Sequence, residues 1–169
     1  MKEEQIDWTS FRKRIFIAKP MDELYSAWAT KLQIESWFLE KADYYAPEDR
    51  IRRADELIQK GDKYLWKWNN WDLAEEGEIL EANGIDSISF TFGKGGNVHI
   101  YLHKLDNGTE VLLIQDNIPT DEVSKLNYYV ECSTGWTFWL ANLKAWLEHG
   151  ITLNAVGIAH SDTKDLVNS

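Results

Sequence analysis

The stretch SISFTFGKGGNVHIYLHKLDNGTEVLLIQDNIP, residues 87–119, shows the clearest secondary-structure pattern in this chain. Apolar and polar residues alternate along three runs within it, and the turns GKGGN and Asp106-Asn107-Gly108 separate these runs. Alternation with a period of two is typical of strands that bury one face, and short turns rich in Gly and Asn join antiparallel neighbours. The stretch therefore predicts consecutive antiparallel strands.

The same alternation extends toward the N-terminus. In GDKYLWKW, residues 61–68, the three rings Tyr64, Trp66 and Trp68 fall on one side of a predicted strand, opposite Lys63, Leu65 and Lys67. EEGEILEA follows at 75–82, and Asn83-Gly84 is a strong hairpin signal. A further strand is predicted at 9–18 from TSFRKRIFIA. Together these segments predict a meander preceded by one isolated strand.

Helices are predicted in two places. Pro20 suits a helix start, and apolar spacing predicts helices over 21–31 and 33–40. Thr120 is a candidate N-cap for a long C-terminal helix of about 28 residues that ends at Gly150. Residues 43–60 fit either an amphipathic helical turn or the arms of a hairpin, and we favour the hairpin.

Strands and helices are thus segregated along the chain, which predicts an α+β domain. We expect a curved antiparallel β-sheet wrapped around the long C-terminal helix, with two short helices after the first strand. The 169 residues suit a single domain, 1–169, with its core at 9–150. The polar segment 151–169 is expected to be partly disordered.

The composition limits the range of possible functions. A formal charge of −10 opposes nucleic-acid backbones and anionic membrane surfaces. The single cysteine, Cys132, excludes an internal disulfide and a multi-cysteine zinc site. The N-terminal MKEEQIDW has no apolar run, so we expect no secretory signal and a cytoplasmic protein. Nine tryptophans indicate either a bulky core or an aromatic-lined cavity.

Several segments, taken in order, resemble one family. They are IAKP at 17–20, IESWF at 34–38, GDKYLWKW, EEGEILEA with Gly77, ISFTF, GTEVLLIQDNIP and STGWTFWLANLKAWLEHG at 133–150. The chain resembles the helix-grip, START-like (SRPBCC) superfamily, in the branch named after the C-terminal domain of the heat-shock protein 90 ATPase activator. The resemblance covers about 10–150. It implies a helix-grip fold, whereas function transfers less readily because one fold hosts many functions.

The aromatic residues are the first candidates for a site, because a helix lying on a curved sheet can leave a cavity between them. They could line a cavity for a flat apolar ligand, or they could simply fill the core. Tyr25, Gln115 and Tyr129 are polar groups that could point inward and anchor a ligand. The candidate ligand-cavity residues are Tyr25, Trp28, Trp37, Trp66, Trp68, Phe90, Phe92, Ile100, Leu113, Gln115, Tyr129, Trp136 and Leu140.

Other polar residues give weaker signals. His99 and His103 lie about 13 Å apart along a strand, too far to share a metal ion, and we expect both on the outer face. Cys132 has no flanking cation and is expected to be an ordinary thiol. The cluster Arg50, Arg52 and Arg53 is either a docking patch or, as we favour, a solvated face. No catalytic motif, metal site or cofactor site is predicted.

Three functions follow from these observations. We expect first a binding module for a small apolar or aromatic ligand. The resemblance implies a second function, that of an interaction protein for the heat-shock protein 90 chaperone. The activator, however, carries a further N-terminal domain, whereas only about ten residues precede the first strand here. An enzyme of cyclase or hydratase type is the third and least expected. A monomer or weak dimer is expected.

Overall fold

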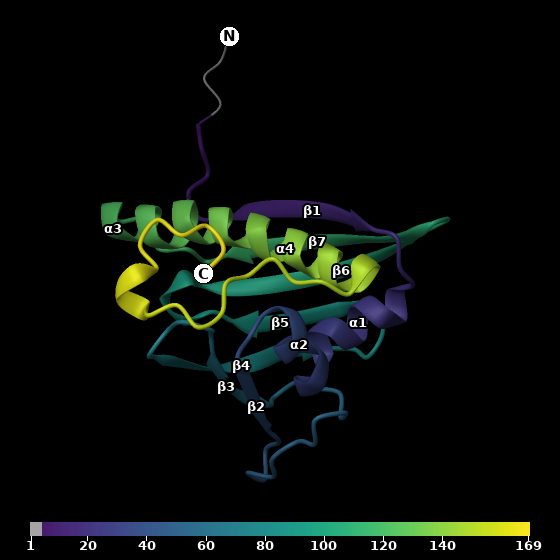
Figure 1. Ribbon diagram of the computed structural model, residues 1–169. Coiled ribbons are helices and arrows are strands. Elements are labelled where there is room, and N and C mark those ends of the chain that lie inside the picture. Colours follow the sequence, from purple (N-terminus) through teal and green to yellow (C-terminus); the bar gives the residue numbers. More distant parts are fainter. Residues whose placement is uncertain (1–4) are drawn as a thin grey trace.

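Seven strands form one antiparallel sheet in the computed structural model, which describes residues 5–169 (Figure 1). The spatial order is β1-β7-β6-β5-β4-β3-β2, so the first strand pairs with the last and the others follow as a meander. The bounds are β1 (Phe11–Ile17), β2 (Lys41–Tyr45), β3 (Lys63–Lys67), β4 (Ala74–Ala82), β5 (Ser87–Thr91), β6 (Asn97–Leu105) and β7 (Gly108–Asp116).

The alternation seen in the sequence sets which face of the sheet is buried. Val98, Ile100 and Leu102 on β6 are all at most 3% exposed. Tyr64 and Trp66 on β3 are buried in the same alternating pattern, and Lys63, which precedes them on the other face, is exposed. Burying one large apolar side chain contributes roughly 1.5–3 kcal/mol, so these period-two runs fix the strand faces. The predicted meander is confirmed.

Two short helices follow β1, as predicted. α1 (Met21–Ala29) begins after Pro20, and α2 (Lys31–Trp37) begins after Thr30. Thr30 separates them because its backbone is extended, and its side-chain oxygen accepts a hydrogen bond from the Gln33 backbone N–H at 3.3 Å, which caps α2. Both helices end earlier than the sequence pattern suggests.

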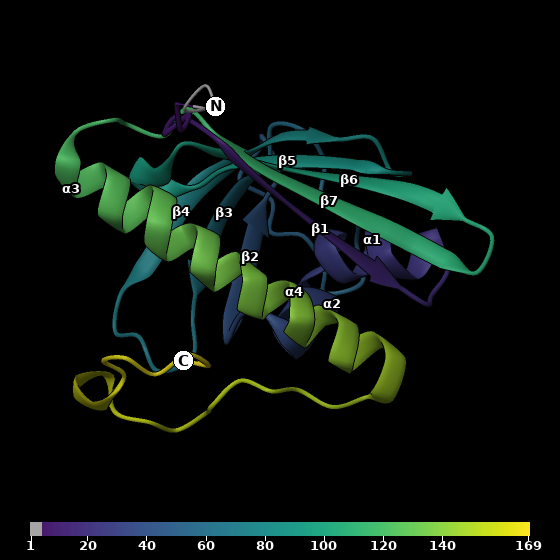
Figure 2. The same cartoon turned by 90° about the horizontal axis from the view of Figure 1, so that it is seen from above.

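The C-terminal helix lies across the sheet (Figures 1 and 2). Its cap is Asp121, whose carboxylate accepts from the Ser124 backbone N–H at 3.0 Å, and not Thr120 as predicted. The first part consists of α3 (Glu122–Ser124) and the π-helix η2 (Lys125–Glu131), and α4 (Cys132–His149) completes it. Gly150 ends α4 with φ +66°, a left-handed conformation that glycine adopts without strain. Trp136, Leu140 and Leu143 are buried.

The segment that joins β2 and β3 corrects one prediction. Of the hairpin predicted within 43–60, only a short one exists, in which residues 44–46 pair with 50–52, while 53–60 form neither a helix nor a strand; the long paired arms are β2 and β3, on either side of the segment. Isolated bridges hold the segment, one from Thr30 to Leu57 and one from Tyr45 to Ile51. Of the apolar positions there, Ile58 is buried, whereas Ile51 and Leu57 are 53% and 39% exposed, so no continuous apolar helix face is buried.

The C-terminal segment 151–169 runs back alongside α4 (Figure 2). The buried Asn142 of α4 accepts a hydrogen bond from the Leu153 backbone N–H at 2.6 Å. Further along, Asn70 donates to the Ala155 carbonyl at 2.8 Å, and Trp71 packs on His160 in the short 3-10 helix η3 (His160–Asp162). These contacts tie the segment to the loop between β3 and β4.

Candidate functional site

Aromatic rings fill the space between α4 and the sheet, and we call this set the aromatic layer. Phe38, which follows α2, lies near its centre, with ring centroids 5.2 Å from Trp37, 5.3 Å from Trp136 and 5.7 Å from Trp68. The members come from α1, α2, β3, β5 and α4 and from the residues that follow α2, β3 and β5. They are Trp28, Trp37, Phe38, Trp66, Trp68, Phe90, Phe92, Trp136 and Trp139.

The structure brings most of the predicted site residues to this layer. Seven of the layer's members were predicted, and Ile100, Leu113 and Leu140 are buried in the same core. Tyr25 lies elsewhere: its hydroxyl accepts from the Gly84 backbone N–H at 2.7 Å, in the turn between β4 and β5. Tyr129 also lies apart, with its ring against Trp8 and Phe11 near β1.

The aromatic layer has a buried deep part and a partly exposed rim. Trp28, Trp37, Trp66 and Trp136 are at most 2% exposed, so in this deep part the rings fill the core. The rim consists of Trp68, Phe92 and Trp139, which are only partly buried while still packing against the deep rings. Of the two alternatives that the sequence left open, filling of the core therefore describes the deep part, while the rim is the part of the layer that is only partly buried.

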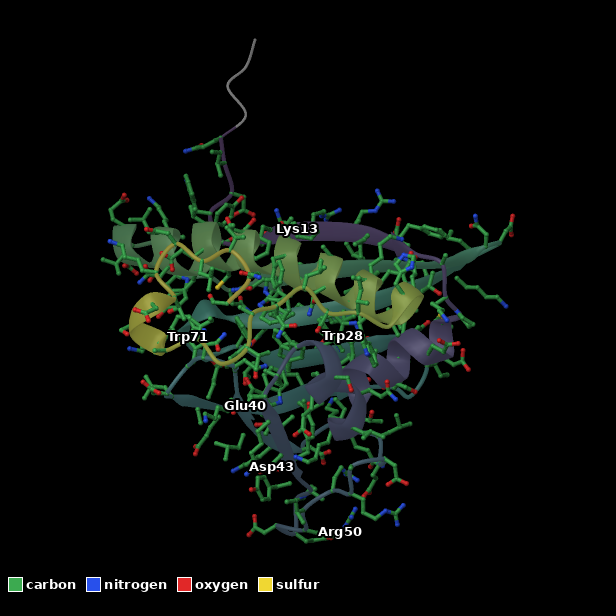
Figure 3. All side chains as sticks on the ribbon, in the orientation of Figure 1. Lys13, Trp28, Glu40, Asp43, Arg50 and Trp71 are labelled. Atoms are coloured by element: carbon green, nitrogen blue, oxygen red, sulfur yellow. The ribbon has the colours of Figure 1, made fainter. Side chains whose placement is uncertain are left out.

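One indole in the deep part lacks a hydrogen bond. The indole N–H of Trp37 donates to the Ala27 carbonyl at 2.9 Å, and that of Trp66 donates to the Tyr44 hydroxyl at 3.2 Å. Trp28 lies below α4 in the view of Figure 3, and its Nε1 is the one buried side-chain nitrogen or oxygen without a partner among residues 5–169. A buried donor without an acceptor costs about 1–3 kcal/mol.

Gln115 on β7 is fully buried and uses both ends of its amide. Its Oε1 accepts from the Trp136 indole N–H at 2.9 Å, and its Nε2 donates to the Gly95 carbonyl at 2.9 Å. Gly95 belongs to the turn η1 (Gly93–Gly95) between β5 and β6. Gln115 therefore positions the Trp136 ring against the rim, and its own polar atoms are satisfied by the protein.

An acidic side chain that sequence reasoning missed lies beside the rim. Glu75 on β4 contacts the Tyr64 hydroxyl at 3.2 Å, and the same hydroxyl also hydrogen-bonds the Thr91 carbonyl. Gly77 allows the Tyr64 side chain to lie across β4 and contact Glu75, because a Cβ at position 77 would stand 2.3 Å from the Tyr64 ring. The signal was present in the sequence: positions 75, 77 and 79 share a strand face, and Ile79 is fully buried.

The environment of Glu75 disfavours its charged form. Burial raises the pKa of Glu75 above its ordinary value, although the hydrogen bond from Tyr64 opposes the rise. Burial also raises the pKa of the Cys132 thiol to about 11, with Glu75 adding to the rise. Cys132 is therefore a neutral thiol in a half-buried position, as the sequence predicted, and not an activated nucleophile.

The arginine cluster corrects another prediction. Arg52 is 7% exposed and donates from Nη2 to Asp62 Oδ1 at 2.8 Å, while its Nε contacts the other carboxylate oxygen. Arg50 and Arg53 pair with Glu56 and Asp55 on the surface, and Figure 3 shows Arg50 at the end of the molecule away from α4. Arg52 is thus a buried structural residue, not part of a solvated face.

The histidines do not form a site. His99 lies within 2.8 Å of Ser89 Oγ and 3.1 Å of Asp116 Oδ2, and the exposed His103 pairs with Glu110 at 3.4 Å. Within the part of the chain that the structure describes, no three His, Cys, Asp or Glu side chains are grouped to hold a metal ion.

A surface cavity of about 520 Å³ lies at the other end of the sheet from the rim. Its walls are the loop Ala18–Asp22 and the tip of the hairpin between β6 and β7, Lys104–Gly108. None of the predicted ligand residues lines it. The rim of the aromatic layer, where the predicted residues Trp68 and Phe92 are partly exposed, is the candidate site.

The architecture defines the class of protein. A seven-stranded antiparallel sheet, two short helices after the first strand and a long C-terminal helix held against the concave face constitute the helix-grip, START-like fold. A family model described as "Activator of Hsp90 ATPase homolog 1-like protein" matches residues 18–148. The chain belongs to this family.

Solved structures confirm the fold. The protein SSP2350 from Staphylococcus saprophyticus is 20% identical, with a TM-score of 0.69 over 87% of this chain and 97% of that one. The Aha1 dimer from Colwellia psychrerythraea is 17% identical, with a TM-score of 0.64 over 83% and 97%. CalU16 from Micromonospora echinospora is 21% identical, with a TM-score of 0.62 over 85% and 76%. At these identities the likeness concerns the fold alone.

Among curated proteins, none matches the chain. Across residues 5–169, the helices are all too short or too polar to cross a bilayer.

Proposed function

We propose that this domain binds a small apolar or aromatic molecule at the rim of the aromatic layer, between α4 and the sheet. The observation that carries the proposal is the continuity of the layer from the core to the surface. Trp68 and Phe92 lie 6.2 Å apart between ring centroids and are both partly exposed, while Phe92 is 5.4 Å from the buried Trp136. Partly exposed rings held rigidly from behind are suited to stacking against a flat ligand.

The elements that carry the rim come from distant parts of the sequence. Trp68 follows β3, Phe92 follows β5, and Trp139 lies on α4. Three rigid elements therefore position the rings independently of one another, which favours a preformed site over one that must assemble around its ligand. The segment 151–169, tied to Asn70 and Trp71, lies close to the loop that follows Trp68.

The experiment is a thermal-shift and native mass spectrometry screen against fatty acids, sterols and aromatic metabolites. A ligand should raise the unfolding temperature of the wild-type protein, and Phe92→Ala should weaken its binding about 5- to 150-fold, since stacking on one aromatic residue is worth about 1–3 kcal/mol. Trp71→Ala is the control, because Trp71 is 44% exposed and outside the aromatic layer. Equal losses in both variants, or no hit in the screen, would contradict the proposal.

A second candidate is a protein-binding role toward the chaperone that the family is named after. The observation that favours it is an apolar stripe on the first part of the C-terminal helix: Val123, Leu126 and Val130 are 66%, 61% and 43% exposed. Exposed apolar residues at spacings of three and four on a helix are suited to packing against a partner.

A pull-down with the middle domain of heat-shock protein 90 tests this role. Wild-type protein should retain the chaperone domain, and Leu126→Asp should abolish retention without changing the unfolding temperature. Glu131→Gln, an exposed position outside the stripe, is the matched control. Loss of self-association in Leu126→Asp, measured by sedimentation, would instead assign the stripe to a contact between two copies of this chain.

A further inference from the structure

We propose that Glu75 makes the rim a site for organic cations, so that the ligand carries an amine or ammonium group attached to an aromatic or apolar body. This inference rests on the ligand-binding function proposed above and narrows its chemical class. The cation would lie at the Glu75 carboxylate, and the body would stack on Phe92 and Trp68.

The position of Glu75 carries the inference. A Cβ built on Gly93 would lie 3.3 Å from Glu75 Oε2, so the carboxylate packs against the backbone that immediately follows Phe92. The Tyr64 hydroxyl holds Oε1 at 3.2 Å, and the Tyr64 ring stacks on Trp66 at 4.0 Å between centroids. The carboxylate is therefore fixed at the edge of the aromatic layer, on the concave side of the sheet.

Glu75 also lacks a positive partner. Among residues 5–169, no Lys, Arg or His forms an ion pair with Glu75; the Tyr64 hydroxyl is its hydrogen-bond partner, and burial raises its pKa. A partly buried carboxylate without a cation is unfavourable, and a ligand that brings one would relieve that cost. The faces of Phe92 and Trp68 carry negative electrostatic potential, which attracts the same cation.

The hydrogen bonds of Tyr64 strengthen this argument. A tyrosine hydroxyl has one proton, and both the Thr91 carbonyl and an ionised Glu75 compete to accept it. The ionised carboxylate is thus under-supplied with donors. An ammonium group brings several donors together with its charge, so it complements this site better than an alcohol or a carbonyl group does.

The backbone beside the rim departs from regular helix. Residues 125–131 form the π-helix η2, immediately before Cys132, and Gln115 Nε2 lies 3.4 Å from the Tyr128 carbonyl within it. Tyr128 of η2 also packs against the turn η1, because a Cβ on Gly95 would stand 3.4 Å from its ring. π-Helical turns often occur at functional sites, and this one packs against the turn that follows Phe92.

The net charge of the whole protein agrees with a cationic ligand. The chain carries a formal charge of −10, which raises the local concentration of cations and repels anions. An aromatic carboxylic acid of the same shape is therefore the ligand class that the site should reject.

The test uses three probes that share an indole ring: tryptamine, its alcohol counterpart tryptophol, and indole acetate. Calorimetry measures affinity, and NMR of the isotope-labelled protein follows the indole N–H signals of the tryptophans. The variant Glu75→Gln removes the charge and keeps the shape. Glu76→Gln is the matched control, because Glu76 neighbours Glu75 on β4 and is exposed.

Wild-type protein should bind tryptamine more tightly than tryptophol and indole acetate, with shifts at Trp68 and Trp136. Glu75→Gln should weaken tryptamine binding about tenfold and leave tryptophol binding within twofold, because only the charged hydrogen bond is lost. Glu76→Gln should behave as wild type. Tryptamine and tryptophol binding equally well, in both wild type and Glu75→Gln, would overturn the cation site and leave the proposed function standing. Binding of none of the probes, together with a negative ligand screen, would overturn both.

Discussion

Two carboxylates inside this domain differ in how far the protein supplies them with charged and hydrogen-bonding partners. Asp62, at the start of β3, is fully buried, and both of its oxygens are occupied: by Arg52, and by the Gln59 backbone N–H at 2.9 Å. Glu75 lies on the neighbouring strand β4 and faces the aromatic layer. Its hydrogen-bond partner is a single hydroxyl, that of Tyr64. The first carboxylate is fully compensated by the protein, and the second is not.

The comparison distinguishes a charged group that stabilises the fold from one that is suited to binding a ligand. Arg52 and Asp62 hold the long loop 46–62 against the sheet, and their charges cancel locally. A pair of this kind needs nothing from outside. The charged form of Glu75 is disfavoured by burial, and titratable groups with perturbed pKa values are concentrated at sites that bind or react. Substitutions at the two positions should therefore change stability in opposite directions.

The largest effect is expected from Asp62→Asn. It removes the buried partner of the Arg52 guanidinium, which then keeps only Glu56, and breaking a buried pair costs about 3–5 kcal/mol. Urea denaturation followed by tryptophan fluorescence would measure the loss. Arg53→Ala is the control, because the Arg53–Asp55 pair has side-chain exposures of 78% and 71%, and surface pairs contribute about 0–1 kcal/mol. Similar losses in both variants would show that Asp62 and Arg52 are not a structural pair.

A smaller effect of opposite sign is expected from Glu75→Gln. The amide can donate to the Tyr64 oxygen while Tyr64 donates to Thr91, so the variant should be more stable than wild type at neutral pH by roughly 1 kcal/mol. The gain should depend on pH. Because the folded-state pKa of Glu75 is raised above 4.5, wild-type stability falls as pH rises through that pKa, and the gain should shrink on acidification toward pH 4.5. A variant less stable than wild type at every pH would refute this prediction.

The smallest effect concerns Glu56, which supports the compensated region. Hydrogen bonds from Arg50 first, and then from the Arg53 backbone and Arg52, lower the pKa of Glu56 to about 2 from 4.5. Its contribution to stability is therefore present above pH 4.5 and is lost as pH falls through about 2. Thermal unfolding of Glu56→Gln against wild type should show a deficit at pH 6 that disappears near pH 2. A deficit independent of pH would assign the residue a packing role instead.

The fold could be predicted from the sequence because its signals are local and repeated. Period-two alternation set the faces of β3 and β6, and turn residues set the meander. The loop 46–62 could not be predicted, because its conformation depends on bridges to Thr30 and Tyr45 and on the buried Arg52. A charged residue gives no local sign that a partner ten positions later will bury it.

The candidate site was predicted in part. The tryptophans of the aromatic layer were identified from their spacing, yet the division into a filled core and a half-exposed rim depends on how rings from five elements meet. Tyr25 and Tyr129 were expected with them and lie elsewhere, because their hydroxyl and ring find nearer partners. Glu75 was missed although its strand face was readable, since acidic neighbours at 76 and 78 make it look like part of an exposed run.

The pairing of the first strand with the last has a consequence during protein synthesis. Phe11 pairs with Gln115, so β1 leaves the ribosome long before its partner exists. At roughly 5–20 residues per second, β1 waits on the order of 5–20 s for β7. Its sequence FRKRIFI carries three basic side chains, and charges of this kind discourage an unpaired strand from joining another chain. The strand that closes the sheet is thus protected until the nascent chain can complete it.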